Sequence, residues 1–180
     1  MRKLSYEEIF SQRPTLSELK MMERLPIYIL LENIRSMYNV GSIFRTSDGA
    51  RISKLFLTGF TPAPPRKEID KTALGATESV PWEYAVNPLP VIKRLKEQGV
   101  RIAAVEHTSE SRNYAEIVFP FPVCLMLGNE VEGLSSEVIK EADFAVELPM
   151  QGIKQSLNVA VAHGVVLYHV MQQFLKQTLT

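Results

Sequence analysis

Short apolar runs recur along this chain and alternate with segments of helical periodicity. Residues 26–31 are apolar throughout, which is typical of a strand in a parallel sheet that is covered on both faces. Similar runs predict strands at residues 52–57, 82–86, 101–106, 123–127 and 144–148. Strands that alternate with helices at this spacing predict an α/β domain with a mostly parallel sheet and helices on both faces.

Helical patterns fill the intervals between these runs. Residues 5–24 predict one or two helices interrupted near Pro14, with Thr15 and Glu18 forming a capping box. Asn39 is the predicted N-cap of a helix that ends at Gly49. Further helices are predicted at residues 71–76, 88–98, 135–141 and 156–176. We therefore expect an N-terminal helical extension, residues 1–25, followed by one domain, residues 26–180.

The composition is that of an ordinary globular protein, with 46% hydrophobic and 22% charged residues among 180. No apolar run approaches the roughly 20 residues of a membrane span, and the N-terminus has no apolar signal-peptide core. We expect a cytoplasmic protein without a membrane partner. The single cysteine, Cys124, excludes an internal disulfide and is expected to be a small buried apolar residue rather than a reactive thiol.

The formal net charge is zero, but the charges are unevenly distributed. Between residues 35 and 71, three acidic residues accompany seven basic ones: Arg35, Arg45, Arg51, Lys54, Arg66, Lys67 and Lys71. Such a patch either holds phosphates or is a solvated surface, and the sequence leaves both interpretations open.

Three junctions between a strand and the following loop are rich in polar residues and glycine: residues 33–45, 128–134 and 149–158. In open α/β sheets, ligands bind outside the carboxyl ends of the strands, so these junctions are the first candidates for a site. None of them matches the dinucleotide fingerprint or a phosphate-binding loop, which argues against a nicotinamide cofactor or a nucleoside triphosphate. No cluster of His or carboxylate residues has the spacing of metal ligands, and no metal is expected.

Together the three junctions resemble the motifs of the SpoU/TrmH-type branch of the SPOUT RNA methyltransferase family. The first motif runs from Asn33 through Asn39 to Arg45, the second covers residues 127–134, and the third covers residues 148–159. The resemblance extends over about residues 26–175 and implies S-adenosylmethionine as the cofactor. It also implies a C-terminal deep trefoil knot and a homodimer formed through the C-terminal helix. The apolar pattern alone predicts an unknotted doubly wound sheet.

The activity that the resemblance implies is methylation of a ribose 2′-hydroxyl in structured RNA, with tRNA favoured over rRNA. Arg45 is implied at the target nucleotide. Because arginine stays protonated, we expect it to clamp a phosphate and to stabilise the developing alkoxide rather than to act as a base. An ion pair with Asp48 on the helix surface is the alternative.

The other residues implied in catalysis each have a structural alternative. Asn39 orients the same region or caps a helix, and Glu130 fixes the second junction for catalysis or braces it. Ser156 and Asn158 contact cofactor or target, or cap the last helix.

The resemblance implies a cofactor site built from backbone groups and apolar walls. Its expected residues are Val105, Glu106, Leu127, Gly128, Asn129, Leu148, Met150, Ser156 and Leu157. His107, His163 and His169 receive no catalytic role, because two lie in the last predicted helix and one lies in a loop. With about 25 residues before the first strand, target recognition is expected to rely on the domain itself, its dimer partner and the basic patch between residues 35 and 71.

Two other functions remain open at the level of sequence. One is a catalytically silent RNA-binding homodimer on the same scaffold. The other is an unrelated α/β enzyme that uses a small nucleotide.

Overall fold

The computed structural model describes residues 1–178, and its centre is a parallel sheet of seven strands. The strand order across the sheet is β3-β2-β1-β6-β4-β7-β5, and every pair of neighbours is parallel. The strands are β1 (Leu25–Glu32), β2 (Ile52–Thr58), β3 (Trp82–Ala85), β4 (Arg101–Val105), β5 (Arg112–Asn113), β6 (Val123–Leu127) and β7 (Phe144–Glu147).

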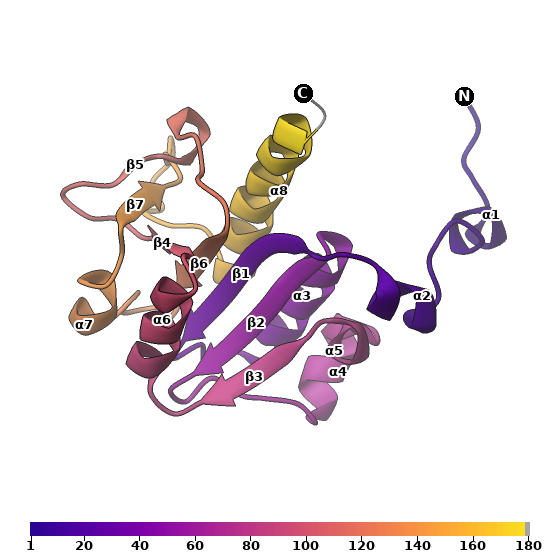
Figure 1. Ribbon diagram of the computed structural model, residues 1–180, viewed down its shortest axis with the longest axis horizontal. Helices are drawn as coiled ribbons and strands as arrows, with labels where there is room; N and C mark the ends of the chain where they lie inside the picture. Colours follow the sequence, from indigo (N-terminus) through magenta and orange to yellow (C-terminus); the bar gives the residue numbers. More distant parts are fainter. Residues whose placement is uncertain (179–180) are drawn as a thin grey trace.

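Helices cover both faces of the sheet (Figure 1). They are α1 (Tyr6–Phe10), α2 (Leu16–Met21), α3 (Met37–Gly49), α4 (Lys67–Ala73), α5 (Ala76–Ser79), α6 (Pro88–Glu97), α7 (Ser136–Ile139) and α8 (Val159–Thr178), with a 3-10 turn η1 at Tyr114–Glu116. Side chains of β1 alternate between two cores. Ile29 packs with residues of α3 and α8, whereas Leu30 packs with residues of α6 and α7. The predicted parallel sheet with helices on both faces is confirmed.

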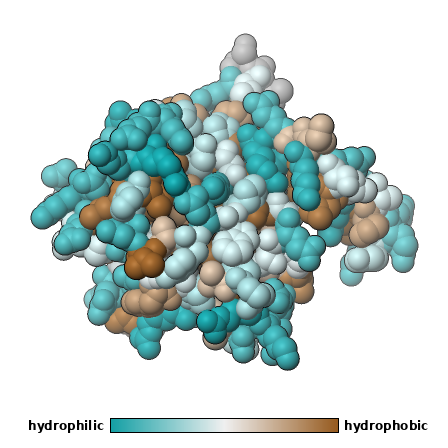
Figure 2. All heavy atoms as spheres, turned by 60° about the horizontal axis from the view of Figure 1, so that its bottom comes forward, coloured by the Kyte–Doolittle hydropathy of each residue, from teal (hydrophilic) through white to brown (hydrophobic). Residues whose placement is uncertain are grey.

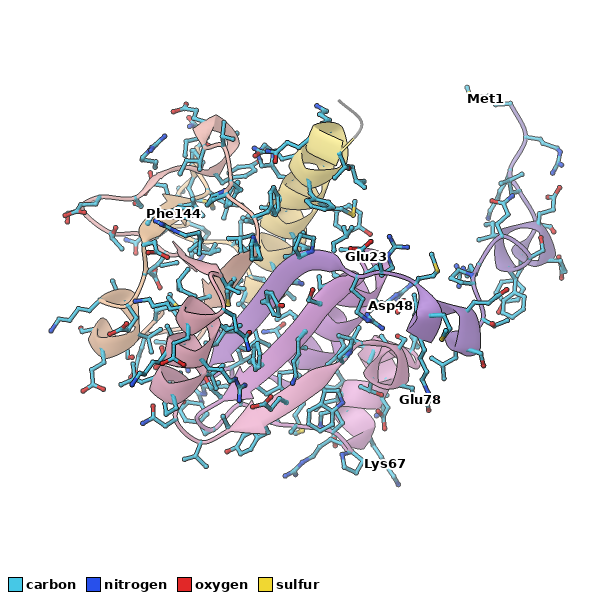
Figure 3. The ribbon with its side chains drawn as sticks, in the orientation of Figure 1. Met1, Glu23, Asp48, Lys67, Glu78 and Phe144 are labelled. Atoms are coloured by element: carbon cyan, nitrogen blue, oxygen red, sulfur yellow. The ribbon has the colours of Figure 1, made fainter. Side chains whose placement is uncertain are left out.

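The first two helices form an arm beside the domain. Each begins with a capping box, Ser5 with Glu8 and Thr15 with Glu18, and neither helix contains a buried residue. Figure 3 shows Met1 at the tip of this arm and Glu23 where it joins β1. The capping box predicted at Thr15 is confirmed, and the interruption near Pro14 separates the two helices.

Most predicted elements lie within one or two residues of the observed ones, and the exceptions are informative. The helix predicted at 71–76 is replaced by α4 and α5, because Leu74 and Gly75 both have left-handed backbone, with φ of 50° and 88°. The helix predicted from residue 156 begins only at Val159. The short strand β5 and the turn η1 were not predicted.

The carboxyl ends of β1, β4, β6 and β7 lie at one edge of the sheet, and β1 is where the strand order switches direction between β2 and β6. This is the position at which open parallel sheets bind ligands. Figure 2 turns the side of the molecule where β1, β2 and β3 end toward the reader, and it shows apolar patches set in a largely hydrophilic surface. Among residues 1–178, no helix has the length and apolar character needed to span a bilayer.

Candidate active site

A pocket of about 210 Å³ opens beyond the ends of β4, β6 and β7. Its walls include these residues predicted for the cofactor: Val105, Glu106, Leu127, Gly128, Asn129, Leu148, Ser156 and Leu157. Met150, also predicted for the cofactor, is not among the residues that line the pocket, and its role stays a prediction. Glu130 and Asn158, predicted for catalysis, also line it. The structure therefore brings together the second and third junctions and the end of β4.

Gly128 allows the second junction to fold back tightly. The backbone of Asn129 and Gly133 exchanges two hydrogen bonds of 3.0 and 2.9 Å, which closes a five-residue loop. A Cβ atom on residue 128 would lie 2.1 Å from the carbonyl carbon of Gly133 and 2.2 Å from the nitrogen of Leu134. Only glycine fits this position, because any side chain would overlap the backbone of the returning loop.

Glu130 joins the second junction to the first. Its Oε2 accepts from the backbone N–H of Arg35 at 2.9 Å, and its Oε1 accepts from the N–H of Ser36 at 3.1 Å. Partial burial disfavours the charged form of Glu130. The hydrogen bonds from Arg35, the Asn39 amide and the backbone outweigh this effect and hold the pKa of the carboxyl below its usual value. Glu130 is therefore a fixed carboxylate near neutral pH.

Asn39 links all three junctions. Its Nδ2 donates to Glu130 Oε1 at 2.9 Å, and its Oδ1 accepts from Nδ2 of Asn158 at 3.1 Å. Its predicted role as an N-cap is wrong, because Ser36 caps α3 through a bond from the N–H of Asn39 to Ser36 Oγ. Asn158, Asn39 and Glu130 thus form one hydrogen-bonded chain at the rim of the pocket.

The start of α8 separates the roles predicted for Ser156 and Asn158. The Oδ1 of Asn158 accepts from the N–H of Ala160 at 2.9 Å, so Asn158 caps the helix and bonds Asn39 at the same time. Ser156 lies before the helix, is exposed, and makes no hydrogen bond with the described part of the chain. The alternative in which Ser156 caps the helix is therefore wrong, while its position in the pocket wall stands.

Arg45 lies outside the pocket. It is exposed on α3, six residues after Asn39, which corresponds to about 9 Å along a helix. There it lines a separate concavity with Lys71 and Tyr168. No ion pair joins Arg45 to Asp48 in residues 1–178, and Asp48 accepts from Ser79 Oγ instead. The ion-pair alternative for Arg45 is therefore wrong.

Two further carboxylates face the pocket. Glu106 accepts from the backbone N–H of Leu134 and of His107, both at 2.9 Å. Glu147 accepts from Ser111 Oγ at 2.6 Å and lies 3.2 Å from His107 Nδ1, and these two contacts lower the pKa of its carboxyl. No lysine or arginine lines the pocket within the described chain. The wall therefore suits a ligand that carries positive charge.

Glu147 and His107 were not predicted for this pocket, because neither belongs to a recognisable site motif. The only available signal was that both lie at the end of a strand, next to residues that were selected.

His163 and His169 lie away from the pocket on α8, and burial lowers the pKa of each imidazole. Cys124 is fully buried in β6, as predicted, and burial raises the pKa of its thiol. No group of three or more His, Cys, Asp or Glu residues in 1–178 is arranged to hold a metal ion.

The seven basic residues between 35 and 71 do not form one surface. Arg35 and Arg66 line one concavity, and Arg45 and Lys71 line another. Lys54 forms an ion pair of 2.7 Å with Glu83. These residues therefore offer separate sites to phosphates rather than one continuous basic patch.

Sequence comparison identifies relatives that are named as RNA ribose methyltransferases. A tRNA (guanosine(18)-2′-O)-methyltransferase of Aquifex aeolicus is 31% identical over 148 residues, which cover 82% of this chain and 69% of that protein. An enzyme of the same name from Thermus thermophilus is 30% identical over 173 residues, which cover 94% of this chain and 87% of that protein. A 23S rRNA (guanosine-2′-O-)-methyltransferase RlmB of Pseudomonas aeruginosa is 27% identical, covering 86% of this chain and 62% of that protein.

Solved structures agree with this assignment. The A. aeolicus TrmH/SpoU tRNA modifying enzyme superimposes with a TM-score of 0.81 at 29% identity, covering 91% of this chain and 84% of that one. An AdoMet-bound rRNA methyltransferase from Sinorhizobium meliloti superimposes with a TM-score of 0.76 at 30% identity, covering 86% of this chain and 59% of that one. The family model described as the SpoU rRNA Methylase family matches residues 26–168. The chain belongs to the SpoU rRNA methylase family.

Proposed function

We propose that this chain transfers a methyl group from S-adenosylmethionine to a ribose 2′-hydroxyl of structured RNA, with tRNA favoured over rRNA. The observation that carries the proposal is the hydrogen-bonded chain of Asn158, Asn39 and Glu130, which joins the three motifs at one pocket. Relatives that are at least 30% identical and named as tRNA ribose methyltransferases favour the tRNA class. The RlmB relative leaves rRNA as the second class.

The pocket fits the proposed cofactor. Apolar side chains of Leu127, Leu148 and Leu157 supply walls for a flat ring, and the backbone near Gly128 supplies polar groups for its edge. Glu106 and Glu147 supply negative charge, which favours the positive sulfonium of the methyl donor. When bound, the donor supplies an activated methyl group on that sulfonium.

The reaction is an in-line displacement. A bond from the ribose oxygen to the methyl carbon forms, the carbon–sulfur bond breaks, and the hydroxyl proton must leave. Positioning therefore dominates catalysis, and the fixed carboxylate of Glu130 holds the Asn39 amide in one orientation. We assign Arg45 to the phosphate of the target nucleotide, where its charge stabilises the alkoxide and this phosphate accepts the proton.

The proposal includes a homodimer formed through α8. Exposed apolar residues Val161, Val165, Tyr168 and Leu175 recur along this helix at spacings of four, three and seven, so they lie on one face. Arg45 shares a concavity with Tyr168, so a partner packed on this face lies beside Arg45. Light scattering of the parent and of Val165→Glu tests this part, and an unchanged mass in the variant contradicts it.

The remaining parts of the proposal concern organisation. We divide the chain into the N-terminal extension, residues 1–25, and the methyltransferase domain, residues 26–180. The absence of buried residues in α1 and α2 supports this division. The C-terminal deep trefoil knot is proposed from family membership, and tracing the path of residues 123–178 in a crystal structure tests it.

Arg45→Ala tests the catalytic assignment. The chain with Arg45→Ala should transfer methyl groups about 10²- to 10³-fold more slowly, because a preorganised charge at the transition state is lost. Binding of S-adenosylhomocysteine, measured by calorimetry, should be unchanged, since Arg45 lies outside the pocket. Arg112→Ala, also at an exposed position, is the matched control. Mass spectrometry of RNA nucleosides reports the product, and normal transfer by Arg45→Ala removes Arg45 from the mechanism.

The same calorimetry separates the alternative function. A catalytically silent RNA-binding homodimer binds RNA but neither S-adenosylmethionine nor S-adenosylhomocysteine. Failure of the parent chain to bind either compound therefore favours that alternative over the proposal.

A further inference from the structure

A second concavity lies at the same edge of the sheet, beyond β1, β2 and β3. It encloses about 410 Å³, and its walls include the aromatic rings of Phe60 and Tyr84 and the side chains of Arg35 and Arg66. Phe60 is 62% exposed and Tyr84 is 45% exposed. No acidic residue of the described chain lines this concavity. Exposed aromatic rings beside arginines are the combination that single-stranded nucleic acids bind.

Phe60 is held in this exposed position by a well-bonded loop. Its backbone N–H donates to Asn33 Oδ1 at 3.1 Å, and the Tyr84 hydroxyl donates to the carbonyl oxygen of Gly59 at 2.7 Å. Gly59 has φ of 65°, and a Cβ there would lie 1.9 Å from Asn33 Oδ1. The polar contacts therefore fix the backbone, while the ring of Phe60 remains outside the core.

The two arginines in this concavity carry uncompensated charge. Neither the Arg35 nor the Arg66 guanidinium makes an ion pair or a hydrogen bond within residues 1–178. In contrast, Lys54 and Arg94, on nearby elements, both pair with Glu83 at 2.7 and 2.8 Å. The concavity thus offers two free guanidinium groups to an anionic partner.

Arg35 links the concavity to the proposed active site. The backbone N–H of Arg35 donates to Glu130, and Glu130 lines the methyl-donor pocket. Arg35 also lines the concavity around Phe60. Arg35 therefore contacts the active-site carboxylate Glu130 through its backbone and also borders the concavity around Phe60.

We propose that Phe60, Arg35 and Arg66 form a docking site for an unpaired nucleotide of the substrate RNA that neighbours the methylated one. The base stacks on the Phe60 ring, and the two guanidinium groups bind its flanking phosphates. The aromatic ring accepts any base, so the site contributes affinity and strand direction rather than base identity. This inference rests on the proposed function, because the docked nucleotide belongs to the RNA that is methylated.

Substitutions of Phe60 test the stacking. The probe is unfractionated tRNA, and the readouts are its dissociation constant by fluorescence anisotropy and KM for methyl transfer. Phe60→Ala should weaken binding about 5- to 150-fold, the range for loss of one stacked base. Phe60→Leu should bind almost as weakly, because it keeps apolar area without a ring face, and Phe60→Trp should restore binding. Val86→Ala, an exposed apolar residue outside the concavity, is the control and should bind like the parent.

Substitutions of the arginines test the phosphate contacts. Arg35→Gln and Arg66→Gln should each reduce the slope of log K against log salt by about 0.7, the value for one phosphate contact on a single strand. Phe60→Ala should weaken binding without a change of slope, because it removes no charge. The docking site is wrong if Phe60→Ala binds RNA with the affinity of the parent and the double variant Arg35→Gln/Arg66→Gln keeps both the affinity and the salt slope of the parent.

The outcomes also separate this inference from the proposed function. If the parent methylates tRNA and the Phe60 and arginine variants keep the parental KM, the docking site is wrong and the function stands. If the parent binds neither tRNA nor S-adenosylhomocysteine, both are wrong. If Phe60→Ala changes the molecular mass in light scattering, the concavity is an interface with a second copy of the chain, which also overturns the RNA site.

Discussion

The buried pair of Ser47 and His163 should make the stability of this protein depend on pH below neutrality. His163 is completely buried on α8, and its Nε2 lies 3.2 Å from Ser47 Oγ on α3. Its Nδ1 is buried and has no partner within residues 1–178. Burial without a compensating charge disfavours protonation and lowers the pKa of His163 from 6.5 to about 3.

The sign of the effect follows from proton uptake. Between about pH 3 and pH 6.5 the unfolded chain protonates His163 and the native chain does not, so the unfolded state binds more protons. The free energy of unfolding therefore decreases as the pH falls, with a limiting slope of about 1.4 kcal/mol per pH unit. Between pH 7 and pH 5, His163 alone lowers the free energy of unfolding by about 2 kcal/mol.

Urea unfolding at pH 5, 6 and 7, monitored by circular dichroism, measures this loss. The double variant Ser47→Ala/His163→Leu replaces both partners by apolar groups and should lose about 2 kcal/mol less than the parent between pH 7 and pH 5. Ser47→Ala alone keeps His163 and should retain the pH dependence of the parent. His169 also has a lowered pKa, but it is present in every variant and cancels in the comparison. Equal pH dependence in the parent and the double variant refutes the reasoning.

Single contacts of Gly128, Glu32 and Cys124 each have a measurable consequence. Gly128→Ala should abolish detectable binding of S-adenosylhomocysteine in calorimetry, because the new Cβ would lie 2.1 Å from the backbone of Gly133, and binding at parental strength contradicts this geometry. Glu32→Gln should lower the free energy of unfolding by about 1–3 kcal/mol in urea titration, because buried Glu32 accepts from both N–H and Oγ of Ser135, and an unchanged midpoint argues against a structural role. Cys124 should react with a disulfide reagent only at the rate of global unfolding, since its thiol is fully buried, and labelling in the native state disproves that burial.

The sequence predicted the strands well because burial on both faces leaves a local record. Residues 123–127 form an apolar run with a buried position at every residue, and β6 has these same bounds. The order of strands leaves no such record, since β6 pairs with β1 although about 90 residues separate them. The strand β5 was missed because it is only two residues long and both residues, Arg112 and Asn113, are polar.

Errors at the site have a common origin in contacts between distant residues. Asn39 has the side chain of an N-cap, but Ser36 takes that role, and the Asn39 amide bonds Glu130, which lies 91 residues later. Similarly, the apolar pattern starting at residue 156 predicted a helix start, but the helix begins after Asn158, whose amide bonds Asn39. Local patterns selected residues that the fold brings to one pocket, and only the fold could show which partners they take.

The three junctions are held with very different strength, and this difference predicts how a ligand in the pocket acts on the protein. The first and second junctions are cross-braced by carboxylates, since Glu130 accepts from backbone N–H groups of the first junction and Glu106 accepts from that of Leu134. In contrast, residues 149–157 make no hydrogen bond with any other described residue, and most of them are exposed.

Because Ser156 and Leu157 nevertheless line the pocket, a bound ligand offers this third junction the hydrogen-bond partners that the protein does not supply. Amide hydrogen exchange with and without S-adenosylhomocysteine tests this consequence. The amides of residues 152–157 should exchange rapidly in the free protein and become protected at least tenfold in the complex, while those of Arg35 and Leu134 should already be slow in the free protein. Equal protection of all three junctions before the ligand is added would mean that the pocket is preformed, and ordering of the third junction would then contribute nothing to binding.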